Sequence, residues 1–122
     1  MKESGEMYLE NILRLSRKLE KVRAIDVAET MNFSKPSVSR ALSILKKDNC
    51  LVVDSDGQIV LTEKGRSIAE KIYERHVVLT DILKKIGVSE ETAEDDACKI
   101  EHYLSDETFE KITECCAKFC GE

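Results

Sequence analysis

Apolar positions along the chain recur mainly at the three- and four-residue spacing of helices that bury one face. This spacing predicts helices over residues 6–20, 24–31, 34–48, 62–86 and 90–104, with a last helix after residue 105. One segment breaks the pattern, because the β-branched runs 51–53 and 59–61 flank an Asp-Gly pair, which is typical of a β-hairpin. The expected order is therefore three helices, a hairpin and three further helices.

The third predicted helix has clear start signals and a clear apolar face. Ser34 is the expected N-cap, and Pro36 is tolerated in the first turn because its missing N–H has no intrahelical partner there. Val38, Leu42 and Leu45 lie on one face and are expected to be buried. Small hydroxyls and long cations occupy the remaining faces of this helix.

Charge is unevenly distributed along the 122 residues, whose formal net charge is −5. Residues 14–47 carry nine Lys or Arg and three Asp or Glu, whereas residues 76–122 carry five and twelve. Local charge rather than total charge sets the electric field at a surface. The basic segment therefore permits a phosphate-facing surface in an acidic protein.

Two short helices joined by a tight turn and followed by a hairpin describe a winged helix-turn-helix. In this arrangement the third helix enters the major groove, where short side chains permit a close approach and cations reach base edges or phosphates. The hairpin tip, residues 55–57, carries no cation and is expected to contribute little to binding. The alternative is a helical domain that does not bind DNA and whose Ser and Lys residues are simply solvated. The residues expected at double-stranded DNA are Lys35, Pro36, Ser37, Ser39, Arg40, Lys46 and Lys47.

A second set of residues points to a metal ion. Cys98, Glu101 and His102 fall at i, i+3 and i+4, so one helix face presents a thiolate, a carboxylate and an imidazole. All three are ligands of first-row transition metals. His76 occupies a buried-stripe position of the long fourth helix, where an imidazole needs a hydrogen bond or a metal. A core histidine with a hydrogen-bond partner remains the alternative for His76.

The first helix adds two further candidate ligands. Met7 and Glu10, three residues apart, offer a thioether and a carboxylate on one side of this helix. Ordinary core packing is the alternative for Met7. Spacing alone does not show that the distant segments converge on one ion.

Composition narrows the class of protein. No apolar run approaches the roughly 20 residues that span a bilayer, and no signal-peptide core follows Met1, so neither membrane insertion nor secretion is expected. The five cysteines fit reduced thiols in the cytoplasm better than a disulfide framework. Cys116 lies in an apolar stripe, whereas Cys115 and Cys120 are open to a structural, redox or metal-binding role. An enzyme is not expected, since no additional general base or substrate-pocket motif is present.

Taken together, these motifs resemble the metal-dependent transcriptional repressors that include the diphtheria toxin repressor and the manganese transport regulator. The resemblance extends from EMYLENILRL through AIDVAETMNFSKPSVSRALSILKKD and VLTEKGRSIAEKIYERH to DACKIEHYLSDE. It implies a mainly α fold with a winged helix-turn-helix in residues 1–73. A helical metal-binding and dimerisation domain would follow in residues 74–122, and the protein would act as a homodimer on a DNA operator. The Src-homology-3-like domain of longer members is not expected, as in the manganese-type members.

The resemblance also implies which residues bind the metal. The positions that match the main site of the iron-type members are Met7, Cys98, Glu101 and His102. His76 matches a histidine ligand of both types, and Glu10 matches a carboxylate ligand of the manganese type. Because Met and Cys favour Fe(II), Co(II) or Ni(II) over Mn(II), the expected ion is Fe(II), with Mn(II) as the alternative. Thr80 replaces a carboxylate of the family's second site, which leaves the number of ions per subunit open.

The expected function is therefore a cytoplasmic, Fe(II)-activated repressor that controls metal-uptake genes. A Mn(II)-responsive repressor on the same fold is one alternative. The other is a metal-independent transcription factor under thiol-redox control through the C-terminal cysteines.

Overall fold

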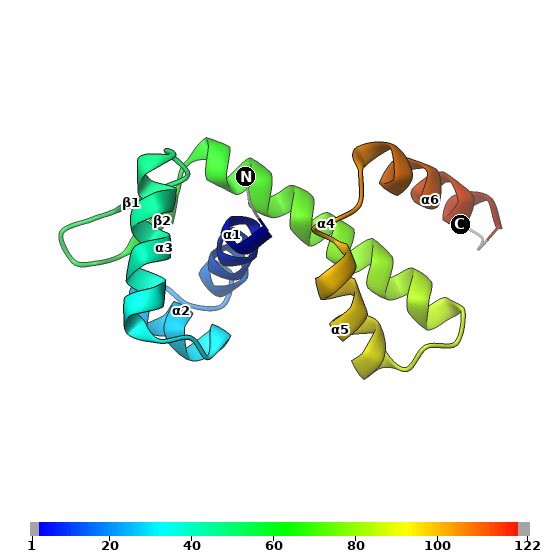
Figure 1. The fold of residues 1–122 in the computed structure, drawn as a ribbon, viewed down its shortest axis with the longest axis horizontal. Coiled ribbons are helices and arrows are strands. Elements are labelled where there is room, and N and C mark those ends of the chain that lie inside the picture. Colours follow the sequence, from blue (N-terminus) through cyan, green and yellow to red (C-terminus); the bar gives the residue numbers. More distant parts are fainter. Residues whose placement is uncertain (1–2, 120–122) are drawn as a thin grey trace. The chain divides into compact units, whose positions relative to one another are not determined.

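The computed structural model describes residues 3–119, which form α-helices and one two-stranded antiparallel sheet (Figure 1). The elements are α1 (Glu3–Ser16), α2 (Ala24–Met31), α3 (Lys35–Lys47), β1 (Leu51–Val53), β2 (Ile59–Leu61), α4 (Glu63–Lys85), α5 (Glu90–Ile100) and α6 (Asp106–Phe119). Their order is the one that the hydrophobic pattern predicts. The chain divides into two compact units, residues 1–71 and 72–122. None of the helices in the described range is long and apolar enough to cross a membrane.

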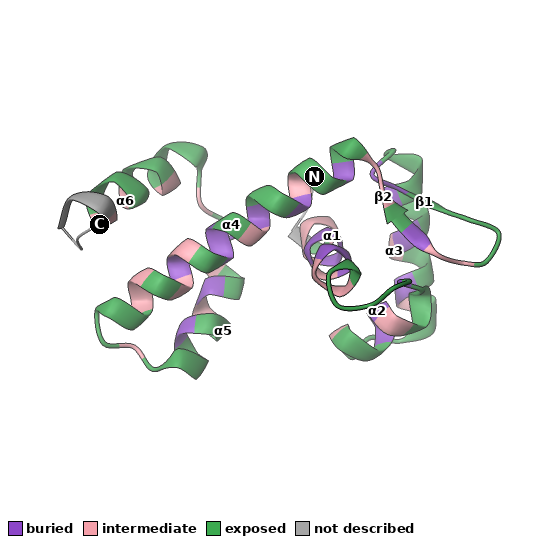
Figure 2. Ribbon diagram, turned by 180° about the vertical axis from the view of Figure 1, so that it is seen from behind, coloured by how far each residue is buried: buried purple, intermediate pink, exposed green. Residues whose placement is uncertain are grey.

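The N-terminal unit packs its first three helices and the hairpin around one core. Figure 2 shows buried residues along the inner sides of α1, α2 and α3. Each buried branched side chain contributes roughly 1.5–3 kcal/mol relative to an exposed one. The side chains exposed by less than 2% in this core include Leu9, Ile12, Leu13, Val27, Val38 and Leu51.

Side-chain caps determine where α3 begins. Ser34 adopts extended backbone angles, and its hydroxyl accepts a hydrogen bond from the backbone N–H of Ser37 at 3.3 Å. Asn32 closes α2 in the left-handed conformation at φ 57°, as the predicted tight turn requires. The ring of Phe33 packs against Tyr8 of α1, with 5.9 Å between ring centroids. The turn before α3 is therefore attached to the first helix.

The predicted hairpin is present, and its two strands pair antiparallel with Val52 opposite Val60. At its tip, the carboxylate of Asp54 accepts hydrogen bonds from the backbone N–H groups of Asp56 and Gln58, both at 2.9 Å. The side chain of Arg23 donates to the carbonyl of Asp56 at 3.1 Å. One cation of the basic segment thus holds the hairpin tip.

The start of α4 makes a very close contact with the segment that enters β1. A Cβ atom on Gly65 would lie 1.9 Å from the carbonyl oxygen of Cys50, so this position accepts only glycine. The hydroxyl of Thr62 donates to the carbonyl of Asn49 at 2.6 Å and accepts from the backbone N–H of Gly65. Cys50 is fully buried, and burial raises the pKa of its thiol against the opposing charge of Lys64.

In the C-terminal unit, α5 lies beside the second half of α4 in both views (Figures 1 and 2). The buried residues of these two helices include Ile72 and Leu79 on α4 and Ala93 and Ala97 on α5. The His76 side chain of α4 lies within hydrogen-bond distance of Glu101 at the end of α5.

Three apolar side chains within the predicted helices 6–20, 24–31 and 62–86 are exposed. Leu19 is 39% exposed because α1 ends at Ser16 and the periodic pattern no longer applies beyond it. Ile25 lies in the first turn of α2 and is 44% exposed. Ile86 is 71% exposed because α4 ends at Lys85.

Helix α6 carries the cysteines that the sequence leaves without a role. Cys115 is exposed, and Cys116 is half-buried, as are Phe109 and Ile112 of the same helix. Cys120 lies outside the described residues.

Replacement of Gly65 by alanine should test the close contact at the start of α4. We expect Gly65→Ala to lower the free energy of unfolding by about 1–3 kcal/mol, because the new Cβ overlaps a backbone carbonyl. The measurement is urea denaturation of the full chain followed by circular dichroism. Ser67→Ala, an exposed site two residues further along α4, is the matched control and should leave stability within about 0.5 kcal/mol. Equal stability of the two variants would contradict the contact.

Candidate functional site

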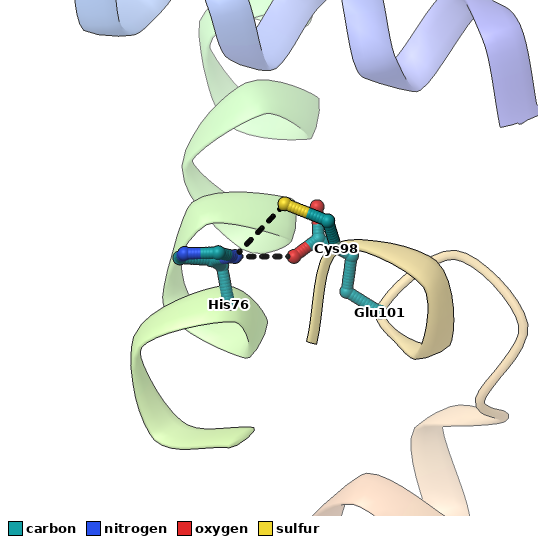
Figure 3. Close-up of side chains that lie close together, drawn as sticks. All are labelled: His76, Cys98 and Glu101. Atoms are coloured by element: carbon teal, nitrogen blue, oxygen red, sulfur yellow. Dashed lines mark hydrogen bonds and ion pairs between the residues drawn. The ribbon is translucent and has the colours of Figure 1, made fainter. Parts of the chain in front are cut away.

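Three candidate ligands converge in the C-terminal unit. His76 projects from α4, and Cys98 and Glu101 come from the last turn of α5 and the residue that caps it (Figure 3). The Nδ1 atom of His76 lies 3.0 Å from Oε1 of Glu101 and 3.7 Å from Sγ of Cys98. One nitrogen, one sulfur and one oxygen atom all lie within 4.8 Å of one another.

His102 lies on the other side of the Glu101 carboxylate. Its Nε2 atom is 3.4 Å from Oε2 of Glu101, and the two side chains are 2% and 1% exposed. The predicted shared helix face is correct only in part, because α5 ends at Ile100 rather than near residue 104. Glu101 keeps helical backbone angles and donates its N–H to Ala97, so it stays in register with Cys98. His102 belongs to the turn that follows.

The chemistry of this cluster fits a divalent transition-metal ion. The Oε2 atom of Glu101 is buried and has no hydrogen-bond partner within residues 3–119. A buried carboxylate is costly unless a cation or hydrogen bonds compensate it. Metal–nitrogen and metal–sulfur bonds of about 2.0–2.3 Å place neighbouring ligand atoms roughly 3–4 Å apart, as these are. The alternative, a buried histidine that is only hydrogen-bonded to Glu101, does not account for the thiol of Cys98 beside the same nitrogen atom.

Two further candidate ligands belong to the N-terminal unit. Met7 is half-buried on α1 of the N-terminal unit, and Glu10 is buried there, with Oε2 2.9 Å from the guanidinium of Arg14. Their participation in metal binding remains a prediction. Thr80 is half-buried one turn after His76, and a neutral hydroxyl is a weaker ligand than the carboxylate it replaces. A second ion likewise remains a prediction.

Sequence reasoning missed Arg75, which is 5% exposed and donates to the backbone carbonyl of Glu101. The sequence could have indicated it, because Arg75 lies three residues after Ile72 and four before Leu79, on the buried face of α4. A charged side chain in such a position must have partners.

Helix α3 presents nearly all of the residues predicted to bind DNA. Val38, Leu42 and Leu45 are buried and attach the helix to its domain. Ser37 is half-buried, and its hydroxyl accepts a hydrogen bond from the hydroxyl of Ser34 at 2.9 Å, which makes it part of the helix cap. The exposed candidates are Lys35, Pro36, Ser39, Arg40, Lys46 and Lys47.

The guanidinium of Arg40 lies close enough to Tyr8 to affect its ionisation. Burial raises the pKa of the Tyr8 hydroxyl, and the positive charge of Arg40 partly opposes that increase. The Tyr8 hydroxyl therefore stays protonated, and it does not neutralise the cation. Arg40 itself lies on the exposed side of α3.

Comparison with known families gives two matches that together cover almost the whole chain. Residues 1–58 match "Iron dependent repressor, N-terminal DNA binding domain". Residues 62–119 match "Iron dependent repressor, metal binding and dimerisation domain". The first match contains α3 and β1, and the second contains the His76, Cys98 and Glu101 cluster.

Individual relatives and structures agree with these matches. The HTH-type transcriptional regulator MntR of Geobacillus kaustophilus is 38% identical over 109 residues, 89% of this chain and 77% of the relative. MntR of Bacillus pumilus is 35% identical, over 89% of this chain and 76% of the relative. The structure of the manganese regulator SloR is 27% identical with a TM-score of 0.79, and covers 90% of this chain. A manganese-dependent transcriptional repressor in complex with manganese is 25% identical with a TM-score of 0.83 over 90% of this chain. This chain spans about half the length of both solved proteins, 52% and 51%.

Replacement of Glu101 by glutamine tests the cluster as a metal site. Glu101→Gln keeps the shape of the side chain but removes the charge, so we expect Mn(II) and Co(II) affinity to fall by about 100-fold or more. The measurement is anaerobic equilibrium titration of each ion into the full-length protein. Glu91→Gln, an exposed acid on the same helix, should bind both ions like the wild type. Unchanged affinity of the Glu101 variant would exclude its carboxylate as a ligand.

Proposed function

Because the chain belongs to the iron-dependent family of DNA-binding, metal-dependent repressors, we propose that it represses transcription in response to a divalent metal ion. The family consists of transcriptional regulators and not of enzymes. We propose further that it acts in the cytoplasm as a homodimer on a double-stranded DNA operator near metal-uptake genes. The observation that carries the proposal is the convergence of His76, Cys98 and Glu101 in a chain that also presents an exposed helix-turn-helix.

Mn(II) is the metal signal that the relatives support best. The curated relatives are named MntR, and two of the similar solved structures are titled a manganese regulator and a manganese-dependent repressor. The Fe(II) preference expected from the sequence is not confirmed. Glu101 and the two histidines suit Mn(II), which takes oxygen and imidazole ligands.

Fe(II) is the second candidate, and Cys98 is the observation that favours it. Its Sγ atom lies within the cluster, and a thiolate is a softer ligand than Mn(II) prefers. Fe(II), like Co(II), accepts mixed nitrogen, oxygen and sulfur ligands. The two candidates share the fold, the DNA interface and the mechanism, and differ only in the ion.

The mechanism follows from thermodynamic linkage. His76, Cys98 and Glu101 would hold the ion, which supplies positive charge to a buried carboxylate and joins α4 to the end of α5. If the protein binds the ion more tightly when it is bound to DNA, then it also binds DNA more tightly when the ion is present. The two affinities increase by the same factor. Coupling of this kind is typically about 1–3 kcal/mol, or roughly 5–150-fold in affinity.

Two groups of exposed residues on α3 would contact different parts of the DNA. Lys46 and Lys47, at the C-terminal end of α3, are suited to backbone phosphates, which contribute affinity without sequence preference. Arg40 and Ser39 lie on the exposed face in the first half of the helix, where side chains reach base edges. Arg23 contributes less, since its side chain holds the hairpin tip.

The first experiment measures DNA binding by anaerobic fluorescence anisotropy at one fixed salt concentration. The probe is DNA from upstream of the gene itself or of a neighbouring transporter, with chelator, Mn(II) or Fe(II). We expect metal to tighten binding by roughly 5–150-fold, with Mn(II) the stronger activator. Cys98→Glu, which replaces sulfur by oxygen, should increase the preference for Mn(II) over Fe(II).

Other outcomes of this experiment select the alternatives. Stronger activation by Fe(II) would support the second candidate. Equal binding with chelator and with metal would contradict metal dependence. Affinity that then changes with oxidant would favour the thiol-redox alternative.

A second experiment separates DNA contact from metal sensing. We expect Arg40→Ala to weaken operator binding by about 1–3 kcal/mol, or roughly 5–150-fold, while its metal affinity stays unchanged. Lys84→Ala removes an exposed cation from α4 in the C-terminal unit and serves as the control. The measurement is anisotropy at several salt concentrations with saturating metal. Equal losses in both variants would mean that Arg40 acts only through net charge.

A further inference from the structure

Arg75 makes an unusual set of contacts for a residue that no proposed function yet uses. Its Nη1 atom donates to the carbonyl oxygens of Glu101, at 3.2 Å, and Leu104, at 2.5 Å. Its Nη2 atom is 2.5 Å from Oδ1 of Asp106, and the guanidinium carbon lies 5.3 Å from the centre of the Phe109 ring. All of these partners belong to the C-terminal unit.

The contacts join two elements that are separate in the sequence of the unit. Glu101 caps α5, where a helix leaves carbonyls unsatisfied and favours a cation, and Leu104 lies in the connection that follows. Asp106 is the first residue of α6, and Phe109 lies one turn into it. The guanidinium therefore connects the end of one helix to the start of the next.

Arg75 and its neighbour His76 hold Glu101 at its two ends. The His76 ring contacts the carboxylate at 3.0 Å, and the Arg75 guanidinium contacts the backbone carbonyl of the same residue at 3.2 Å. A movement of Glu101 that includes its backbone therefore changes the position of its carbonyl relative to Arg75. The guanidinium is positioned to pass such a movement on to Asp106.

We propose that Arg75 is a positioning residue that links the His76, Cys98 and Glu101 cluster to the first turn of α6. Metal binding at the cluster then orders that turn, within the segment matched by the dimerisation domain. The inference rests on the proposed function, because it requires that the cluster binds a metal ion. It adds a route by which the bound state of the cluster reaches a helix that supplies no ligand to it.

The chemistry of the link requires arginine. A planar guanidinium presents several N–H donors in a rigid fork and can stack on an aromatic ring at the same time. Two carbonyls, one carboxylate and one ring are contacted together here. A lysine keeps the charge, but its single ammonium group cannot span these partners in the same geometry.

Hydrogen–deuterium exchange of the full chain, with and without saturating Mn(II), tests the link. The compared segments are residues 97–104, which contain Cys98 and Glu101, and residues 106–112, which begin α6. In the wild type we expect Mn(II) to slow exchange in both segments by about fivefold or more. In Arg75→Lys and Asp106→Asn we expect slower exchange only in residues 97–104, with the ratio for residues 106–112 falling toward one.

Matched controls separate positioning from simple structural support. Glu107→Gln removes the same charge one residue along α6 and should respond to Mn(II) like the wild type. Asp106→Asn should bind Mn(II) within about threefold of the wild type, whereas Arg75→Lys should bind about 10–100-fold more weakly because Glu101 is less well positioned. Loss of the electron paramagnetic resonance signal of free Mn(II) reports that binding.

The possible results distinguish this inference from the proposed function. Metal-dependent protection of residues 106–112 that persists in both Arg75→Lys and Asp106→Asn would overturn the link and leave the metal site standing. Wild-type protein that binds neither Mn(II) nor, under anaerobic conditions, Fe(II) would contradict the proposed function itself. Protection lost in both variants but retained in Glu107→Gln is the result that the link requires.

Discussion

A buried carboxylate is the constraint around which the C-terminal unit is organised. Glu101 is 1% exposed, and its desolvation must be balanced by groups that reach it from elsewhere in the unit. His76 reaches it from α4, His102 from the following turn, and the thiol of Cys98 lies beside the same imidazole nitrogen. The cluster therefore depends on the packing of α5 beside α4, in which Ala93 and Ala97 are fully buried.

The N-terminal unit obeys a different constraint, which is the exposure of one helix. The apolar face of α3 is buried in a core that involves α1, α2 and β1, so the opposite face is rigidly presented. The cap at Ser34 and the attached turn at Phe33 define where that helix starts. Each unit thus has its own core, and the residues expected at the DNA are not among the candidate metal ligands.

Local rules made much of this structure predictable from the sequence. The Asp-Gly pair, the Ser34 cap and the spacing of Val38, Leu42 and Leu45 depend on neighbours a few residues away, and each agrees with the structure. The burial of His76 was equally readable from its place in an apolar stripe. The end of α5 and the role of Arg75 were not, because both depend on contacts between residues 26 to 31 positions apart. Ligand softness alone also gave a different metal from the one that the relatives support, since selectivity depends on the complete ligand set and on metal availability.

The thiols of Cys50 and Cys98 differ in how readily they react in the native protein. The thiol of Cys50 is fully buried and its raised pKa leaves little thiolate at neutral pH, so alkylating reagents will react with it only slowly. Cys98 is exposed, and its sulfur would be shielded only while it coordinates an ion. The rate at which an alkylating reagent modifies Cys98 therefore reports how much of the protein holds a metal ion. Mass spectrometry of the peptide that contains Cys98 measures this rate without labelled DNA.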